Sequence, residues 1–125
     1  MNKEQLIALT KEFIHEATHY NMEYLDRIYS KDLTIVMVDE NDQVNTMDKE
    51  QTLGYFQERL DNDAPPLSEE SDFLYAGGDD RLAMVLVRRT MQFNARLEKM
   101  LFTLFWQKTD IGWQVVKESS SISPA

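Results

Sequence analysis

The sequence predicts an α+β domain in which helices from the first half of the chain pack on an antiparallel sheet formed by the second half. Three observations indicate this class: an apolar stripe at helical spacing near the N-terminus, regularly spaced turn signals after residue 70, and no repeat or linker within 125 residues. We expect one domain over residues 1–125, with residues 122–125 as a frayed tail.

The N-terminal segment is predicted to form two consecutive helices. Apolar side chains recur there at steps of three and four, which is the stripe of an amphipathic helix, at Leu6, Leu9, Phe13, Ala17, Tyr20 and Tyr24. Asn21 interrupts the stripe. We therefore expect one helix to end near Tyr20, and Asn21 to cap a second, short helix that runs to Tyr29.

A hairpin and a third helix are predicted next. The segments Thr34–Val38 and Gln43–Met47 predict two strands joined by a polar turn. Asp48, followed three residues later by Gln51, is a variant of the capping box and predicts the start of a helix. The acidic segment Asn62–Glu70 contains two prolines and predicts a loop.

Four further strands are predicted at Ser71–Ala76, Leu82–Phe93, Leu97–Lys108 and Trp113–Ser121, with turns at residues 77–80, 94–96 and 109–112. Side chains alternate between the two faces of a strand, and neither face of the last three strands is polar. An antiparallel sheet with a solvated face shows clear apolar–polar alternation. We therefore expect helices to cover one face and a second copy of the chain to cover the other.

Alternation assigns particular side chains to the two faces. The face toward the helices is predicted to carry Arg88, Leu104, Trp106 and Glu118. The face toward the partner in a homodimer is predicted to carry Val85, Val87, Phe105, Trp113 and Val115.

Composition excludes several classes of partner. The net charge of −9 repels phosphate backbones and anionic lipid, so we expect neither a nucleic acid nor a membrane partner. The absence of cysteine excludes disulfides and thiolate metal sites, and is consistent with a cytoplasmic location. We identify no secretion signal and no apolar run of the roughly 20 residues that span a bilayer.

Residues 15–19 spell H-E-x-x-H, the motif that places two imidazoles one helical turn apart in zinc proteases. Phe13 and Ala17 define the buried side of this helix, so His15 points away from it and His19 lies on its flank. We interpret the motif as exposed surface without a third ligand or a cleft. No metal site is expected, and adventitious metal binding is the alternative.

Two segments of the C-terminal half resemble the nuclear transport factor 2-like (NTF2-like) or SnoaL-like superfamily. Val87–Thr90 is similar to a strand of the association domain of calcium/calmodulin-dependent protein kinase II. Trp106 with Gly112–Val116 is similar to the closing hairpin of that domain. The resemblance implies a cone-shaped, cystatin-like α+β domain with a pocket between its helices and the concave sheet face. It also implies dimerisation through the convex face.

The resemblance also implies what the pocket contains. Arg88 matches one arginine of the association-domain pocket, whereas Leu104 and Ser120 stand where that pocket has two others. We therefore expect a small, largely apolar ligand with one polar anchor. The candidate ligand-binding residues are Arg88, Glu118, Trp106, Tyr20 and Met37.

Each of these candidates also has a simpler interpretation. Arg88 and Glu118 either hold a ligand or form a buried pair whose members satisfy each other. Trp106 is either a pocket wall or part of the core, and Tyr20 is mainly core with a hydroxyl that reaches the pocket. Met37 is either an adaptable lining of the pocket or ordinary packing.

Ketosteroid isomerases belong to the same superfamily and use two carboxylic acids and a tyrosine. The resemblance places Met37, Leu104 and Phe13 at those three positions, so we expect no catalysis of that type and no cofactor. Two other functions stay open: an association module with a vestigial pocket, and a hydratase or isomerase that uses Glu118 as its base.

Overall fold

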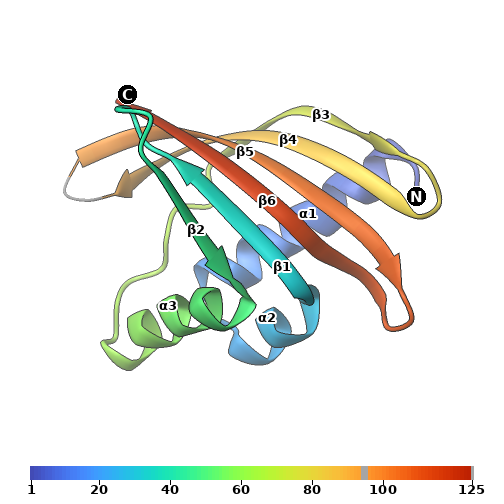
Figure 1. The fold of residues 1–125 in the computed structure, drawn as a ribbon, viewed down its shortest axis with the longest axis horizontal. Helices are drawn as coiled ribbons and strands as arrows, with labels where there is room; N and C mark the ends of the chain where they lie inside the picture. The colour runs from blue at the N-terminus through green and yellow to red at the C-terminus, as the bar shows by residue number, and fades with distance from the viewer. Residues whose placement is uncertain (94–95, 125) are drawn as a thin grey trace.

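Among residues 1–93 and 96–124, which the computed structural model describes, three helices lie on one side of a curved six-stranded sheet (Figure 1). The helices are α1 (Lys3–Thr18), α2 (Met22–Ile28) and α3 (Lys49–Asp61). The strands are β1 (Tyr29–Val38), β2 (Val44–Asp48), β3 (Ser71–Gly78), β4 (Leu82–Phe93), β5 (Arg96–Thr109) and β6 (Gly112–Pro124). The predicted α+β class is confirmed. In the described part of the chain, no helix is long and apolar enough to cross a membrane.

The helices begin where the capping residues predict. The Asp48 side chain accepts from the Gln51 backbone and the Gln51 side chain accepts from the Asp48 backbone, both at 2.9 Å, which completes the predicted capping box of α3. Asn2 and Gln5 form the same arrangement at the start of α1. These reciprocal bonds satisfy backbone donors that a helix start would otherwise leave unpaired.

The break between the first two helices also follows the prediction. Tyr20 has a φ of 58°, a left-handed conformation that cannot continue α1. The Asn21 side chain then accepts from the Tyr24 backbone at 3.2 Å and caps α2. The chain turns here, so that α2 leads directly into β1 at the edge of the helical layer.

The strand order is β2-β1-β6-β5-β4-β3. All neighbouring pairs are antiparallel except β1 and β6, which are parallel and pair from Tyr29 opposite Val115 to Val38 opposite Ser121. The predicted antiparallel sheet therefore holds for the meander β3–β6. Because the chain does not connect β1 to β6 by a hairpin, that pair is free to be parallel.

Two predicted boundaries are wrong. β1 starts at Tyr29 rather than at Thr34, because α2 ends at Ile28 and leads directly into the sheet, five residues earlier than the apolar run suggests. Residues 122–124 are not frayed, since Ile122 pairs with Met100 and Ser123 with Lys99 on the long strand β5. The turn predicted at residues 94–96 falls largely on residues 94–95, which lie outside the described residues, as does Ala125.

A bulge in β6 shifts the register between β5 and β6. Trp106 lies opposite Val115, Phe105 lies opposite Lys117, and Val116 is the extra residue on the bulged strand. The bulge places Val115 and Glu118 on the same face, whereas strict alternation would place them on opposite faces.

The predicted dimer face is wrong for four of its five residues, and only Phe105 lies on the outer face. Val85, Val87 and Val115 are 0%, 1% and 0% exposed and lie beneath the helices. Trp113 packs partly against the same core, and Phe105 is half-buried on the opposite face. Because both faces of β4 are apolar, alternation separates two sets of side chains but does not tell which set faces the helices.

Trp106 lies at the centre of the core and is fully buried. Its indole Nε1 donates to Thr10 Oγ1 on α1 at 3.1 Å, and its ring packs edge-to-face on Phe13 with centroids 5.7 Å apart. Thr10 Oγ1 in turn donates to the Leu6 carbonyl. This chain of contacts fixes the depth at which α1 lies on the sheet.

We expect Thr10→Val to lower the free energy of unfolding by roughly 1–3 kcal/mol, because valine keeps the shape but leaves the buried indole N–H unpaired. Urea unfolding of the two proteins measures the difference. Thr46→Val on the exposed edge strand β2 is the matched control, with a change of less than about 0.5 kcal/mol expected. Equal effects of the two substitutions would contradict a stabilising role for the Thr10–Trp106 hydrogen bond.

Candidate functional site

A cavity of about 240 Å³ lies between the helices and the concave face of the sheet. Its walls are mainly aliphatic, aromatic and thioether side chains, including Phe13, Ala17, Ile35, Met37, Met47, Phe56, Val87, Met91, Met100, Phe102 and Leu104. Four of these are methionines, whose unbranched side chains adapt to irregular ligand shapes.

Arg89 brings the positive charge into this apolar cavity. Its guanidinium donates to the Ser68 carbonyl and lies over the Phe102 ring, 5.4 Å from the ring centroid. The buried Nε of Arg89 has no hydrogen-bond partner among the described residues. A buried donor without an acceptor is costly, so this N–H is available to an acceptor placed in the cavity.

Glu118 is the acidic group of the cavity. Burial raises the pKa of its carboxyl from 4.5 to about 7, while the positive charge of Arg89 acts in the opposite direction. Burial and the nearby Glu118 together raise the pKa of Tyr29, whose ring also lines the cavity. Near neutral pH the Glu118 carboxyl therefore exists in both protonation states and can donate or accept a hydrogen bond.

Of the predicted ligand-binding residues, Glu118 and Met37 line the cavity. Arg88 does not. It alternates with buried Val87 and cavity-lining Arg89, so its side chain lies on the outer face of β4. The prediction that Arg88 shares the concave face with Glu118 is wrong, and its neighbour Arg89 occupies that place.

The other two predicted wall residues have structural roles. Trp106 belongs to the core described above and is absent from the cavity walls. The Tyr20 hydroxyl donates to the Pro65 carbonyl at 2.6 Å and accepts from Arg59 Nε at 2.8 Å, so it ties the loop after α3 to the helices. The core interpretation therefore accounts for both side chains.

The sequence contained a signal for Arg89 that the prediction did not use. Arg89 shares its face of β4 with Val85, Val87 and Met91, all of which are buried. The side chains on this face of β4 are more uniformly apolar than those on the face that carries Arg88. A charged side chain among apolar ones is typical of a buried functional group. The cavity roles of Tyr29 and Tyr55 had no comparable signal, because their positions depend on how α2 and α3 meet the sheet.

A family model described as a SnoaL-like domain matches residues 6–125. The chain belongs to the SnoaL-like domain family. A search of curated proteins finds no match to this SnoaL-like domain.

Solved structures with the same fold include several NTF2-like proteins. One of unknown function from Silicibacter pomeroyi superposes with a TM-score of 0.75 at 14% identity, and the match covers 98% of this chain and all of the other. A provisionally assigned ketosteroid isomerase from Parabacteroides distasonis gives 0.67 at 16% identity, covering 98% of this chain and 89% of that one.

A third structure bears on the resemblance to the kinase association domain. A provisionally assigned calcium/calmodulin-dependent protein kinase II association domain from Xanthomonas campestris gives a TM-score of 0.65 at 18% identity. The match covers 96% of the SnoaL-like domain and 86% of the other chain. At these identities the likeness establishes a common fold.

The positions predicted to match the ketosteroid isomerase acids and tyrosine all line the cavity. Met37, Leu104 and Phe13 contribute to its walls, and none of them can transfer a proton. Among the described cavity residues of this SnoaL-like domain, Glu118 is the one carboxylic acid.

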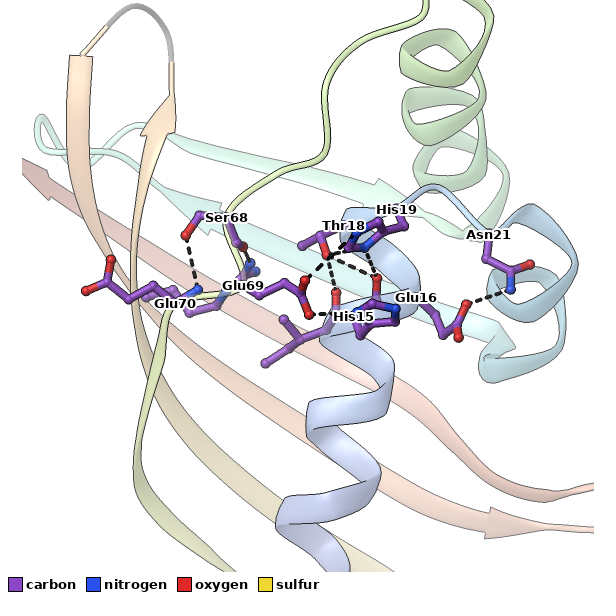
Figure 2. Close-up of polar contacts among 10 residues, drawn as sticks. His15, Glu16, Thr18, His19, Asn21, Ser68, Glu69 and Glu70 are labelled. Atoms are coloured by element: carbon purple, nitrogen blue, oxygen red, sulfur yellow. Dashed lines mark hydrogen bonds and ion pairs between the residues drawn. The ribbon is translucent and has the colours of Figure 1, made fainter.

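The H-E-x-x-H segment lies outside the cavity, and its predicted exposure is confirmed. The side chains of His15 and His19 are 55% and 39% exposed. The expectation that no third ligand is near is wrong. Glu69, from the loop between α3 and β3, reaches both imidazoles (Figure 2).

We expect the Glu118 carboxyl to make stability fall as pH rises from about 4.5 to about 7. The folded state holds this proton more tightly than the unfolded state, so the free energy of unfolding decreases across that window by roughly 3 kcal/mol. Below it both states are protonated, and above it both are ionised. Glu118→Gln cannot titrate and should lack this contribution.

Urea unfolding of both proteins across this pH range measures the contribution as the change in their stability difference. Taking the difference cancels every other titrating group and any constant cost of the substitution. A difference that stays the same at all pH values would contradict the raised pKa.

Proposed function

We propose that this SnoaL-like domain is a homodimer that binds a small, largely apolar ligand with one polar group. The observation that carries the proposal is the apolar cavity with an Arg89 N–H that has no partner among the described residues. A cysteine-free composition supports the further proposal that the protein works in the cytoplasm.

The size of the cavity supports a ligand with two rings. An engineered apolar cavity of about 150 Å³ holds benzene, so about 240 Å³ suits a molecule one ring larger. Methionine, phenylalanine and aliphatic walls favour a hydrocarbon body over a sugar or a nucleotide, which would leave many hydroxyls unpaired.

Arg89 and Glu118 together favour an uncharged polar group on the ligand. Glu118 offsets the charge of Arg89, so a fully charged ligand carboxylate would face the Glu118 carboxylate as well as the guanidinium. A carbonyl or hydroxyl oxygen avoids this repulsion and can accept from Arg89 Nε. We therefore propose Arg89 as the anchor, Glu118 as its neighbour and Met37 as a wall.

We expect 2-naphthol, a bicyclic probe with one hydroxyl, to bind, and Arg89→Gln to weaken its binding about tenfold, since a hydrogen bond to a charged group is lost. Fluorescence titration measures both affinities. Arg88→Gln is the matched control, because the adjacent arginine lies on the opposite face and should leave affinity unchanged.

Two further probes and one further variant sharpen this test. Naphthalene, without the hydroxyl, should bind the unmodified protein more weakly than 2-naphthol, and 2-naphthoate should do the same because of its charge. Met37→Trp should exclude 2-naphthol by filling the cavity. Equal affinity of Arg88→Gln and Arg89→Gln for 2-naphthol would contradict the assigned anchor.

The proposed dimer uses the outer face of the central strands. Met84 lies opposite Phe105 and Leu101 lies opposite Arg88 on that face of β4 and β5, and all four side chains are half-buried. Leu86 adds a further apolar group on the same face. Four large apolar side chains on one sheet face, with Arg88 among them, support a dimer through Phe105 with Met84, Leu86 and Leu101 as its companions.

We expect Phe105→Asp to convert the dimer to a monomer in sedimentation equilibrium at micromolar concentration. A carboxylate buried in the dimer interface would cost more free energy than the interface contact contributes. Ile111→Asp, in the β5–β6 turn and 66% exposed, is the control and should stay dimeric. A monomeric unmodified protein would contradict the proposal directly.

A catalytic role is the second candidate, and the raised pKa of Glu118 favours it. A carboxylate with a pKa of about 7 in an apolar cavity is suited to general acid–base chemistry such as isomerisation or hydration. Since it is the one carboxylic acid among the described cavity residues, Glu118→Gln is the variant that separates a binder from an enzyme. The association-module alternative differs from both in requiring the dimer without any ligand.

A further inference from the structure

Three side chains that can ligate a metal meet at the C-terminal end of α1, outside the cavity. His15 lies in the last turn of α1, His19 is the residue that caps it, and Glu69 comes from the α3–β3 loop (residues 62–70). His15 Nδ1 is 2.8 Å from Glu69 Oε1, and His19 Nε2 is 3.9 Å from Glu69 Oε2. The three ligating atoms all lie within 4.8 Å of one another (Figure 2).

These residue types and separations suit zinc. Two imidazoles and one glutamate form a common zinc ligand set, with water as the fourth ligand. Ligand atoms around a tetrahedral zinc are about 3.3 Å apart at normal bond lengths. The separations of 2.8 and 3.9 Å lie on either side of that value, so small rotations of exposed side chains would complete the geometry.

The hydrogen bonds of His19 favour metal binding. Its Nδ1 lies 2.8 Å from the His15 carbonyl, which can only accept, so Nδ1 carries the proton and Nε2 keeps its lone pair. A carbonyl partner for the second ring nitrogen is the usual way in which a metal-binding histidine is oriented. The negative end of the α1 dipole and the net charge of −9 also favour a cation here.

The site is not arranged like that of a zinc protease. Glu16, which would be the general base in the H-E-x-x-H motif, points the other way, and its carboxylate accepts from Asn21 Nδ2 at 2.6 Å (Figure 2). The metal would therefore connect two segments of the chain rather than activate water for hydrolysis.

We propose that His15, His19 and Glu69 bind one zinc ion that fastens the α3–β3 loop to the end of α1. The loop already touches α1 through the Leu67 N–H, which donates to the Thr18 carbonyl at 3.1 Å. Its Leu67 side chain also lines the cavity and its Ser68 carbonyl accepts from Arg89. The zinc site thus fixes a segment that forms one wall of the cavity.

Calorimetric titration of the metal-free, tag-free protein with ZnCl₂ tests the site. We expect one zinc per chain with micromolar affinity, and at least about a tenfold loss in His19→Ala and in Glu69→Gln. Glu70→Gln is the matched control, because this neighbouring carboxylate points away from the histidines (Figure 2). Glu16→Gln should also bind normally, and MgCl₂ and CaCl₂, which prefer oxygen ligands, should not bind.

Hydrogen–deuterium exchange tests the fastening of the loop. Zinc should slow exchange at residues 67–70 in the unmodified protein and leave it unchanged in Glu69→Gln. Equal zinc affinities in Glu69→Gln and Glu70→Gln, or several weak sites per chain, would overturn the site as adventitious binding. Zinc binding without slower amide exchange at residues 67–70 would contradict the proposal that the ion holds the α3–β3 loop against α1. No cavity ligand is used, so these results are independent of the 2-naphthol titration.

Discussion

The bulge at Val116 is the constraint on which the rest of the structure depends. β6 is a central strand, hydrogen-bonded to β1 on one side and β5 on the other. Its first part presents Val115 to the Trp106 core and its second part presents Glu118 to the cavity. Without the extra residue, the second half of β6 would turn Glu118 outward and place Lys117 among apolar side chains. The bulge thus lets one face of β6 contribute first to the apolar core, through Val115, and then to the cavity, through the carboxyl group of Glu118.

The cavity combines an apolar lining with a buried pair of opposite charges, which is an expensive arrangement. Desolvation acts against both ions: it raises the pKa of Glu118 and lowers the pKa of Arg89, and each charge partly offsets the cost for the other. A buried pair of this kind contributes little net stability, and apolar residues of the same size would often do as well. Its small contribution to stability is one reason to propose that the pair contacts a ligand.

The α3–β3 loop connects the helices, the cavity and the cluster of metal-ligating side chains. Pro65 receives the Tyr20 hydroxyl, Leu67 bonds to the end of α1, and Ser68 receives Arg89. Glu69 then meets His15 and His19 on the outer side. The same short loop therefore contacts both the cavity, through Leu67 and Ser68, and the exposed histidines, through Glu69.

The sequence by itself determined the class of the fold, the order of its elements and the helix starts at Asn21 and Asp48, because these depend on local periodicity and capping. It also placed Leu104, Trp106 and Glu118 correctly on the sheet face toward the helices. Only the tertiary structure decided which face of β4 is buried, and hence that Arg89 rather than Arg88 enters the cavity. The reason is that two apolar faces carry the same local signal, and the choice between them is made by the helices that cover one. In the same way, only the path of a distant loop could bring Glu69 to the two histidines.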